Sequence, residues 1–183
     1  FREKILVNYK LILQASITGV LFHGFYLGGV FFSYSIGLSA TLSALIVGLQ
    51  PILTNILAGP ILKETVSYHQ WIGILLGFLG AVLVLGFDIG KNIPFDGVIA
   101  TIISLISITS ATIWQKKISN NLPLETSNTY QAIGGCLFHI LIIIFFTKFQ
   151  INFSFTFIAA MSHQVLLVSF GAFTILMLLI REN

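Results

Sequence analysis

Polar side chains are rare in this sequence, and a few of them stand in the middle of long apolar blocks. His23 lies near the centre of the first block, with Tyr26 one helical turn further on. An imidazole can change its charge near neutral pH, and ionisable groups deep in apolar segments usually face the interior of a helix bundle. One interpretation of His23 is a substrate contact or a proton-linked switch. The simpler alternative is a neutral imidazole that forms a hydrogen bond inside the bundle.

A second polar position combines an amide with a helix-breaking residue. Pro51 has no amide proton, so the carbonyl of Val47 loses its usual partner and the helix is expected to bend there. Gln50 places a side-chain amide at the same depth. A bent helix with a polar amide beside it can line a substrate path. The sequence leaves open the alternative that Gln50 only satisfies freed backbone groups or binds a neighbouring helix.

Other kinds of chemistry have little support. All the acidic residues fall in short polar segments or at block ends, so a carboxylate relay of the kind that pumps use is not visible. They are Glu3, Glu64, Asp88, Asp96, Glu125 and Glu182. The sequence has no Walker, HExxH or GxSxG motif, and it has a single cysteine, Cys136. We therefore expect no enzyme activity, no metal site and no cofactor.

The composition decides which class of protein must position these residues. Of 183 residues, 56% are hydrophobic and 8% are charged, whereas an average soluble domain carries about 25% charged residues. So few charges cannot cover a globular surface with solvated groups. This excludes a soluble enzyme, a nucleic-acid-binding protein and a disordered chain. We predict an integral membrane protein that is surrounded by the lipid bilayer and has no nucleic-acid partner.

Six apolar blocks are long enough to cross a bilayer, which takes about 20 apolar residues in a helix. Such runs must be helical, because every backbone group in lipid has to pair within its own segment. The predicted fold is an all-α, polytopic membrane helix bundle of about six transmembrane helices, and residues 35–39 predict a tight hairpin between the first two. The predicted spans are residues 11–35, 39–62, 71–88, 95–115, 127–147 and 160–180.

Positive charges predict the orientation of the bundle. In the alternating loops, Lys91 and Lys148 fall on one side and all the other basic residues on the opposite side. The positive-inside rule makes the richer side cytoplasmic, so we expect both ends of the chain in the cytoplasm and the protein in the cell (inner) membrane. The residues on the richer side are Arg2, Lys4, Lys10, Lys63, Lys116, Lys117 and Arg181.

Glycines spaced by about one helical turn predict close helix contacts. Helices in lipid gain no hydrophobic energy from meeting each other, so they associate through small residues that let backbones approach. Gly24 and Gly28 form such a pair in the first block, and Gly73, Gly77 and Gly80 share one face of the third. We expect both faces to pack against other helices.

A longer pattern of residues resembles a known family. The matching segments are 28–32 (GGVFF), 37–54 (GLSATLSALIVGLQPILT), 63–64 (KE), 70–73 (QWIG), 77–85 (GFLGAVLVL) and 171–176 (GAFTIL) with Arg181. They are similar to EamA-type transporters of the drug/metabolite transporter superfamily. In this resemblance, the six blocks correspond to helices three to eight of the family's ten.

The resemblance implies a partial inverted-repeat transporter fold. The family has two inverted repeats of five helices around a central cavity. Residues 1–90 would be the last three helices of the first repeat, and residues 91–183 the first three helices of the second. The chain is then expected to be a truncated one that lacks two helices at each end.

The resemblance also implies a function and a site. The expected function is that of a secondary transporter, an exporter, that moves small metabolites by alternating access. The implied cavity residues are His23, Tyr26, Ser43 and Gln50, with Pro51 as the helix kink; Ser43 joins the set because it lies seven residues before Gln50, on the same face. The alternative is a non-transporting six-helix membrane protein, or a decayed-gene product, that acts at most as a partner subunit. A homodimer is left open.

Overall fold

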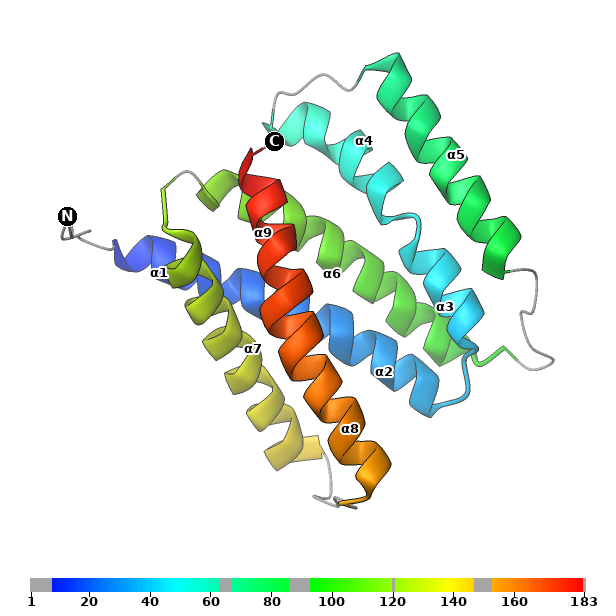
Figure 1. Cartoon of the computed structure of the whole chain (residues 1–183), viewed down its shortest axis with the longest axis vertical. Helices are drawn as coiled ribbons and strands as arrows, with labels where there is room; N and C mark the ends of the chain where they lie inside the picture. The colour runs from blue at the N-terminus through cyan, green and yellow to red at the C-terminus, as the bar shows by residue number, and fades with distance from the viewer. Residues whose placement is uncertain (1–7, 63–66, 86–92, 120, 147–152, 183) are drawn as a thin grey trace.

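The computed structural model describes residues 8–62, 67–85, 93–119, 121–146 and 153–182, and every element within these ranges is a helix (Figure 1). The elements are α1 (Tyr9–Gly19), the π-helical segment η1 (Val20–Leu27), α2 (Gly28–Ser35), α3 (Ala40–Val47), α4 (Gln50–Leu62), α5 (Tyr68–Leu85), α6 (Phe95–Ser119), α7 (Leu124–Phe146), α8 (Phe155–His163), the π-helical segment η2 (Gln164–Ala172) and α9 (Phe173–Glu182). Within the described residues all six predicted blocks are helical, the second with a turn at residues 48–49, and the all-α bundle is confirmed.

Within the described ranges, five helical spans are long and apolar enough to cross a membrane. They are Tyr9–Ser35, Ala40–Leu62, Phe95–Ser119, Leu124–Phe146 and Phe155–Leu176. The predicted third span corresponds to α5, whose apolar part, Tyr68–Leu83, is shorter than the others. The predicted end of that span, at residue 88, lies outside the described residues. The bundle is therefore that of a multi-pass membrane protein, with five full-length candidate spans and one shorter apolar helix.

The interior of the bundle contains many polar side chains beside its small apolar clusters, and its surface is apolar. Large apolar side chains point outward, so that Leu83 is 81% exposed and Phe146 is 79% exposed. The largest fully buried side chains are all polar: Gln115, Gln131, Thr18, Thr101, Thr109, Ser33, Ser43, Ser104 and Ser127. Acyl chains solvate such a surface, while buried polar groups find partners inside the protein. The distribution of side chains thus fits a lipid environment.

Helix α6 runs through the middle of the bundle (Figure 1). It contacts the α1–η1–α2 rod on one side and the α3–α4 pair on another, and it also touches α9. Helix α7 lies along α1 and η1, while α5 contacts α3 and α4 at the outer edge. In this arrangement both α6 and α7 link the second half of the chain to the first.

The turn between the first two spans depends on one glycine. Gly37 has a φ of +94°, in the left-handed region that side-chain-bearing residues rarely adopt. The Leu38 amide donates to the Ser33 carbonyl at 3.0 Å, which closes the end of α2. The Ser39 hydroxyl then accepts from the Leu42 amide at 3.2 Å and caps α3. The predicted hairpin is confirmed.

Glycines allow α1 and α7 to cross with their backbones in contact. A Cβ atom on Gly19 would lie 2.5 Å from the carbonyl carbon and the Cα of Gln131. A Cβ atom on Gly134 would lie 2.9 Å from the carbonyl carbon and the Cα of Ser16. Each glycine therefore faces the backbone of the other helix, as expected where helices associate in lipid.

The predicted glycine contacts hold for the first span and not for α5. A Cβ on Gly24 would lie 2.6 Å from Cδ1 of the Phe138 ring, and one on Gly28 would lie 3.4 Å from Cε1 of His139. In α5, a Cβ would meet no described atom within 4 Å at Gly73, Gly77 or Gly80. The prediction that this α5 face packs on another helix is therefore wrong within the described part of the chain. The prediction fails because α5 contacts α3 and α4 through a different face.

Candidate functional site

The second span is interrupted at the position where Pro51 predicts a bend (Figure 1). Helix α3 ends at Val47 and α4 begins at Gln50, with a short turn between them. The Leu49 amide donates to the Ile46 carbonyl at 3.1 Å, a tighter i to i+3 bond than the α-helix uses. Pro51 cannot donate to the Val47 carbonyl, so the continuous ladder ends here.

A cavity of about 410 Å³ adjoins this break. It lies between the first span and the α3–α4 pair. Three of the four candidate cavity residues line it: Tyr26 from η1, Ser43 from α3 and Gln50 from the first position of α4. Pro51 lines it as well. The structure thus brings together Tyr26 and Gln50, which are 24 positions apart in the sequence.

The Ser43 hydroxyl is the unusual group of this cavity. Serine and threonine within these helices commonly donate to the carbonyl one turn back, as Thr109 does to Leu105 at 2.7 Å. Ser43 is fully buried, and its Oγ has no hydrogen-bond partner among the described residues. A buried hydroxyl without a partner costs about 1–3 kcal/mol. The cavity therefore contains a polar atom whose hydrogen-bonding capacity is unused.

Gln50 connects the break to the central helix. Its Nε2 donates to Thr54 Oγ1 on the same helix at 3.3 Å and to Thr112 Oγ1 on α6 at 3.4 Å. The sequence left open whether this amide lines a path or binds a neighbouring helix. In the structure the amide binds α6, and Gln50 also lines the cavity. That this cavity is a path stays a prediction.

His23 lies apart from the other three candidates. It lines a second cavity, of about 520 Å³, together with residues of α7 and with Phe170 and Thr174 of the last span. Its backbone carbonyl is 2.9 Å from Nε2 of His139 on α7. The predicted set is therefore divided between two sides of the first span, because His23 and Tyr26 point in different directions from η1.

The π-helical segment η1 is held by donors from two neighbouring helices. The His139 ring binds the His23 carbonyl, and the Ser104 hydroxyl on α6 donates to the Phe25 carbonyl at 3.3 Å. A carbonyl only accepts, so Nε2 of His139 carries the proton. A π-helical turn displaces carbonyls from the regular ladder, and inserted side chains can satisfy them. An imidazole bonded inside the bundle was one interpretation of His139 from the sequence, but its partner and that of Ser104 could not be predicted, because they depend on which helix lies beside η1.

We expect His139→Phe to lower the melting temperature of the purified protein. The ring keeps its bulk but the His23 carbonyl loses its donor, a loss of about 1–2 kcal/mol. His139→Gln should retain part of the stability, because a side-chain amide can still donate. The matched control is His69→Phe on the exposed face of α5. Equal melting temperatures for His139→Phe and the parent, measured by thermal unfolding in detergent, would contradict this role.

A buried amide cluster between α6 and α7 was also missed from the sequence. Gln131 Nε2 donates to Gln115 Oε1 at 2.7 Å and to Ser127 Oγ at 2.9 Å. The predicted fourth span ends at residue 115, whereas α6 continues to Ser119. Gln115 therefore lies inside a helix and not at its end. The polar residues at the start of the fifth block could have indicated a partner of this kind.

Two comparisons with known proteins bear on the chain as a whole. A curated relative, the "Uncharacterized transporter YyaM" of Bacillus subtilis (strain 168), is 31% identical over 115 residues, which cover 57% of this chain and 36% of the relative. The chain thus spans about a third of the length of that relative. No solved structure gives a significant match. The profile of the EamA-like transporter family matches residues 1–86, the segment that contains η1, the broken helix and its cavity. As the sequence motifs indicated, residues 1–86 of this chain are therefore similar to the EamA-like transporter family.

Proposed function

We propose that this protein is a secondary transporter of small metabolites and that the cavity at the α3–α4 break is part of its substrate path. One observation carries the proposal: an interrupted membrane helix adjoins a cavity that contains the Gln50 amide and a buried Ser43 hydroxyl with no partner in the described part of the chain. Irregular backbone at membrane depth is tolerated where it is buried in protein or lines a cavity. In carriers, the ends of discontinuous helices often form the substrate site.

The proposed mechanism is alternating access between two inverted repeats, residues 1–90 and residues 91–183. The two π-helical segments support this division. η1 lies in the middle of the first span and η2 in the middle of the last. In the proposed division, each of these two spans is the third helix of a five-helix repeat. The same irregularity in equivalent helices is what a repeated unit would produce.

The proposed direction is export across the cell inner membrane, with both chain ends in the cytoplasm. The described basic residues support the cytoplasmic placement of the chain ends. Lys10 lies in the first turn of α1, and Lys116 and Lys117 lie in the last turn of α6. These two helix ends lie on the same side of an alternating bundle, and the positive-inside rule makes that side cytoplasmic. Arg2, Lys4, Lys63, Lys91 and Lys148 lie outside the described residues.

A metabolite export screen with the complete gene tests the function. Cells that express the full-length protein should release one class of metabolite faster than cells with an empty vector. Uptake into liposomes then compares the full-length protein with the 183-residue chain. If the isolated chain transports as well as the full-length protein, the proposed truncation is wrong. If neither of them moves any solute, the transporter proposal itself is wrong.

We expect Gln50→Ala in the full-length protein to lower transport about tenfold, as the loss of a polar contact with a buried ligand would do. Expression should fall much less, because Gln50 is half-buried and its bonds to the two threonines are long. Asn55→Ala is the matched control, since Asn55 bonds the Pro51 carbonyl of the same helix without lining the cavity. Equal losses of transport and expression in Gln50→Ala would make the residue purely structural.

A further inference from the structure

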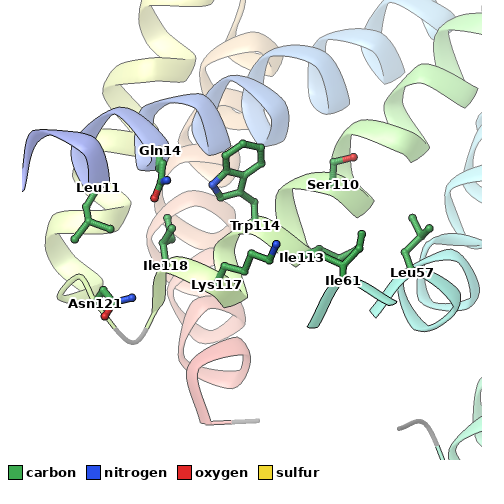
Figure 2. A pocket seen from close by; sticks show the side chains of 10 residues that line it. All are labelled: Leu11, Gln14, Leu57, Ile61, Ser110, Ile113, Trp114, Lys117, Ile118 and Asn121. Atoms are coloured by element: carbon green, nitrogen blue, oxygen red, sulfur yellow. The ribbon is translucent and has the colours of Figure 1, made fainter. Parts of the chain in front are cut away.

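We propose that a third cavity, between α1, α4 and α6, binds an anionic group that is carried on an apolar body. This cavity measures about 600 Å³ (Figure 2). It opens where α1 begins and where α4 and α6 end. It shares no lining residue with the cavity at the α3–α4 break, so the inference is independent of the proposed substrate path.

The polar groups that line the cavity are suited to an anion. Lys117 is the charged residue among them, and Gln14, Trp114 and Asn121 supply amide and indole N–H groups. Figure 2 shows Lys117 and Trp114 reaching from α6 into the same space, with Gln14 of α1 beside them. No acidic side chain is among the described residues that line this cavity. Ammonium, indole and amide groups all donate hydrogen bonds, and a carboxylate or phosphate oxygen accepts them.

A lysine at a helix end also has a simpler explanation. Cations near a helix C-terminus interact favourably with its dipole, and positive charges accumulate on the cytoplasmic side of membrane proteins. Lys116 satisfies both conditions equally well, but it does not line the cavity. The two adjacent lysines can therefore be compared with each other. Of the two, Lys117 alone lines the cavity, together with one indole and two side-chain amides.

The remaining wall of the cavity is apolar. Leu57 and Ile61 of α4 and Ile113 of α6 contribute to this wall. A small hydrated anion such as chloride gains nothing from such a wall, whereas the hydrocarbon part of an amphiphile loses contact with water there. The ligand class is thus a single anionic group on an apolar body. It has two sources, a free organic acid or the phosphate of an anionic lipid.

Calorimetric titration of the full-length protein in phosphatidylcholine nanodiscs tests this site. The probe is cyclohexanecarboxylate, and its neutral, similarly shaped control is cyclohexanecarboxamide. We expect the carboxylate to bind more tightly than the amide, and Lys117→Gln to weaken carboxylate binding about tenfold while it leaves amide binding unchanged. Lys117→Arg should keep the preference, and Lys116→Gln should not alter it. Gln50→Ala should leave this binding intact even where transport is lost.

A second arm distinguishes the lipid source. Phosphatidylglycerol retained by the purified protein is counted by native mass spectrometry for the parent, Lys117→Gln and Lys116→Gln. Loss of a bound phosphatidylglycerol in Lys117→Gln alone supports the site with a lipid as its ligand. A carboxylate preference that depends on Lys117, without such a loss, supports it with a free acid. If neither measurement depends on Lys117, or if both lysine variants behave alike, the proposal is overturned.

Discussion

Replacing Gly19 by alanine is expected to lower both the yield and the melting temperature of the protein. The new Cβ would lie 2.5 Å from backbone atoms of Gln131 on α7, and backbone cannot move aside as a flexible side chain can. Overpacking of this kind costs about 1–3 kcal/mol. The cost should lie at the upper end of that range, because a shift of α7 here also strains the hydrogen bond between Gln131 and Gln115.

The control for this variant is Gly77→Ala on α5. A Cβ there meets no described atom within 4 Å, and alanine favours a helix over glycine by about 1 kcal/mol. We therefore expect an unchanged or slightly higher melting temperature. Thermal unfolding of both variants in the same detergent gives the comparison. If Gly19→Ala were as stable as Gly77→Ala, the close crossing of α1 and α7 would be wrong.

Ser43→Ala is expected to change stability and transport in opposite directions. The variant removes a buried hydroxyl that has no partner among the described residues, so the melting temperature should rise, by the equivalent of about 1 kcal/mol. If the same hydroxyl binds substrate, transport by the full-length protein should fall about fivefold or more. A residue with a purely structural role would lose stability and transport together.

Ser33→Ala provides the matched control for Ser43→Ala. Ser33 is also fully buried, but its hydroxyl already donates to the Val30 carbonyl at 2.7 Å and it does not line the cavity. Its removal should lower the melting temperature slightly and leave transport unchanged at equal expression. A Ser43→Ala protein that is less stable than the parent, with normal transport, would refute the substrate role of this hydroxyl.

The features that were predictable from the sequence are those that a short segment determines by itself. Long apolar runs become helices in lipid wherever they pack. Gly37 supplies the left-handed residue of the hairpin, and Pro51 removes a backbone donor whatever surrounds it. Each of these effects acts within one or two turns of the chain. The six helices, the hairpin and the site of the helix break could therefore be placed in advance.

The features that could not be predicted depend on which helices are neighbours. His139 has a partner because α7 lies beside η1, and Gln115 is buried because Gln131 faces it across α6 and α7. The glycine face of α5 was expected to pack, but spacing alone does not say which face meets a neighbour. From the sequence, Lys117 could be used only to predict the orientation of the bundle, because the cavity that it lines is formed by three separate helices.

The irregular turns of η1 also change which residues of the first span share a helix face. A π-helical segment amounts to one extra residue in an α-helix, and one residue corresponds to a rotation of about 100°. The stretch before Val20 and the stretch after Leu27 are therefore out of phase, and a single helical wheel drawn through Tyr9–Ser35 misassigns one of its halves. Gln14 of α1 and Val30 of α2, which line different cavities, belong to these two phases. Deleting one residue within η1 would merge the phases and turn one half of the span away from its present neighbours.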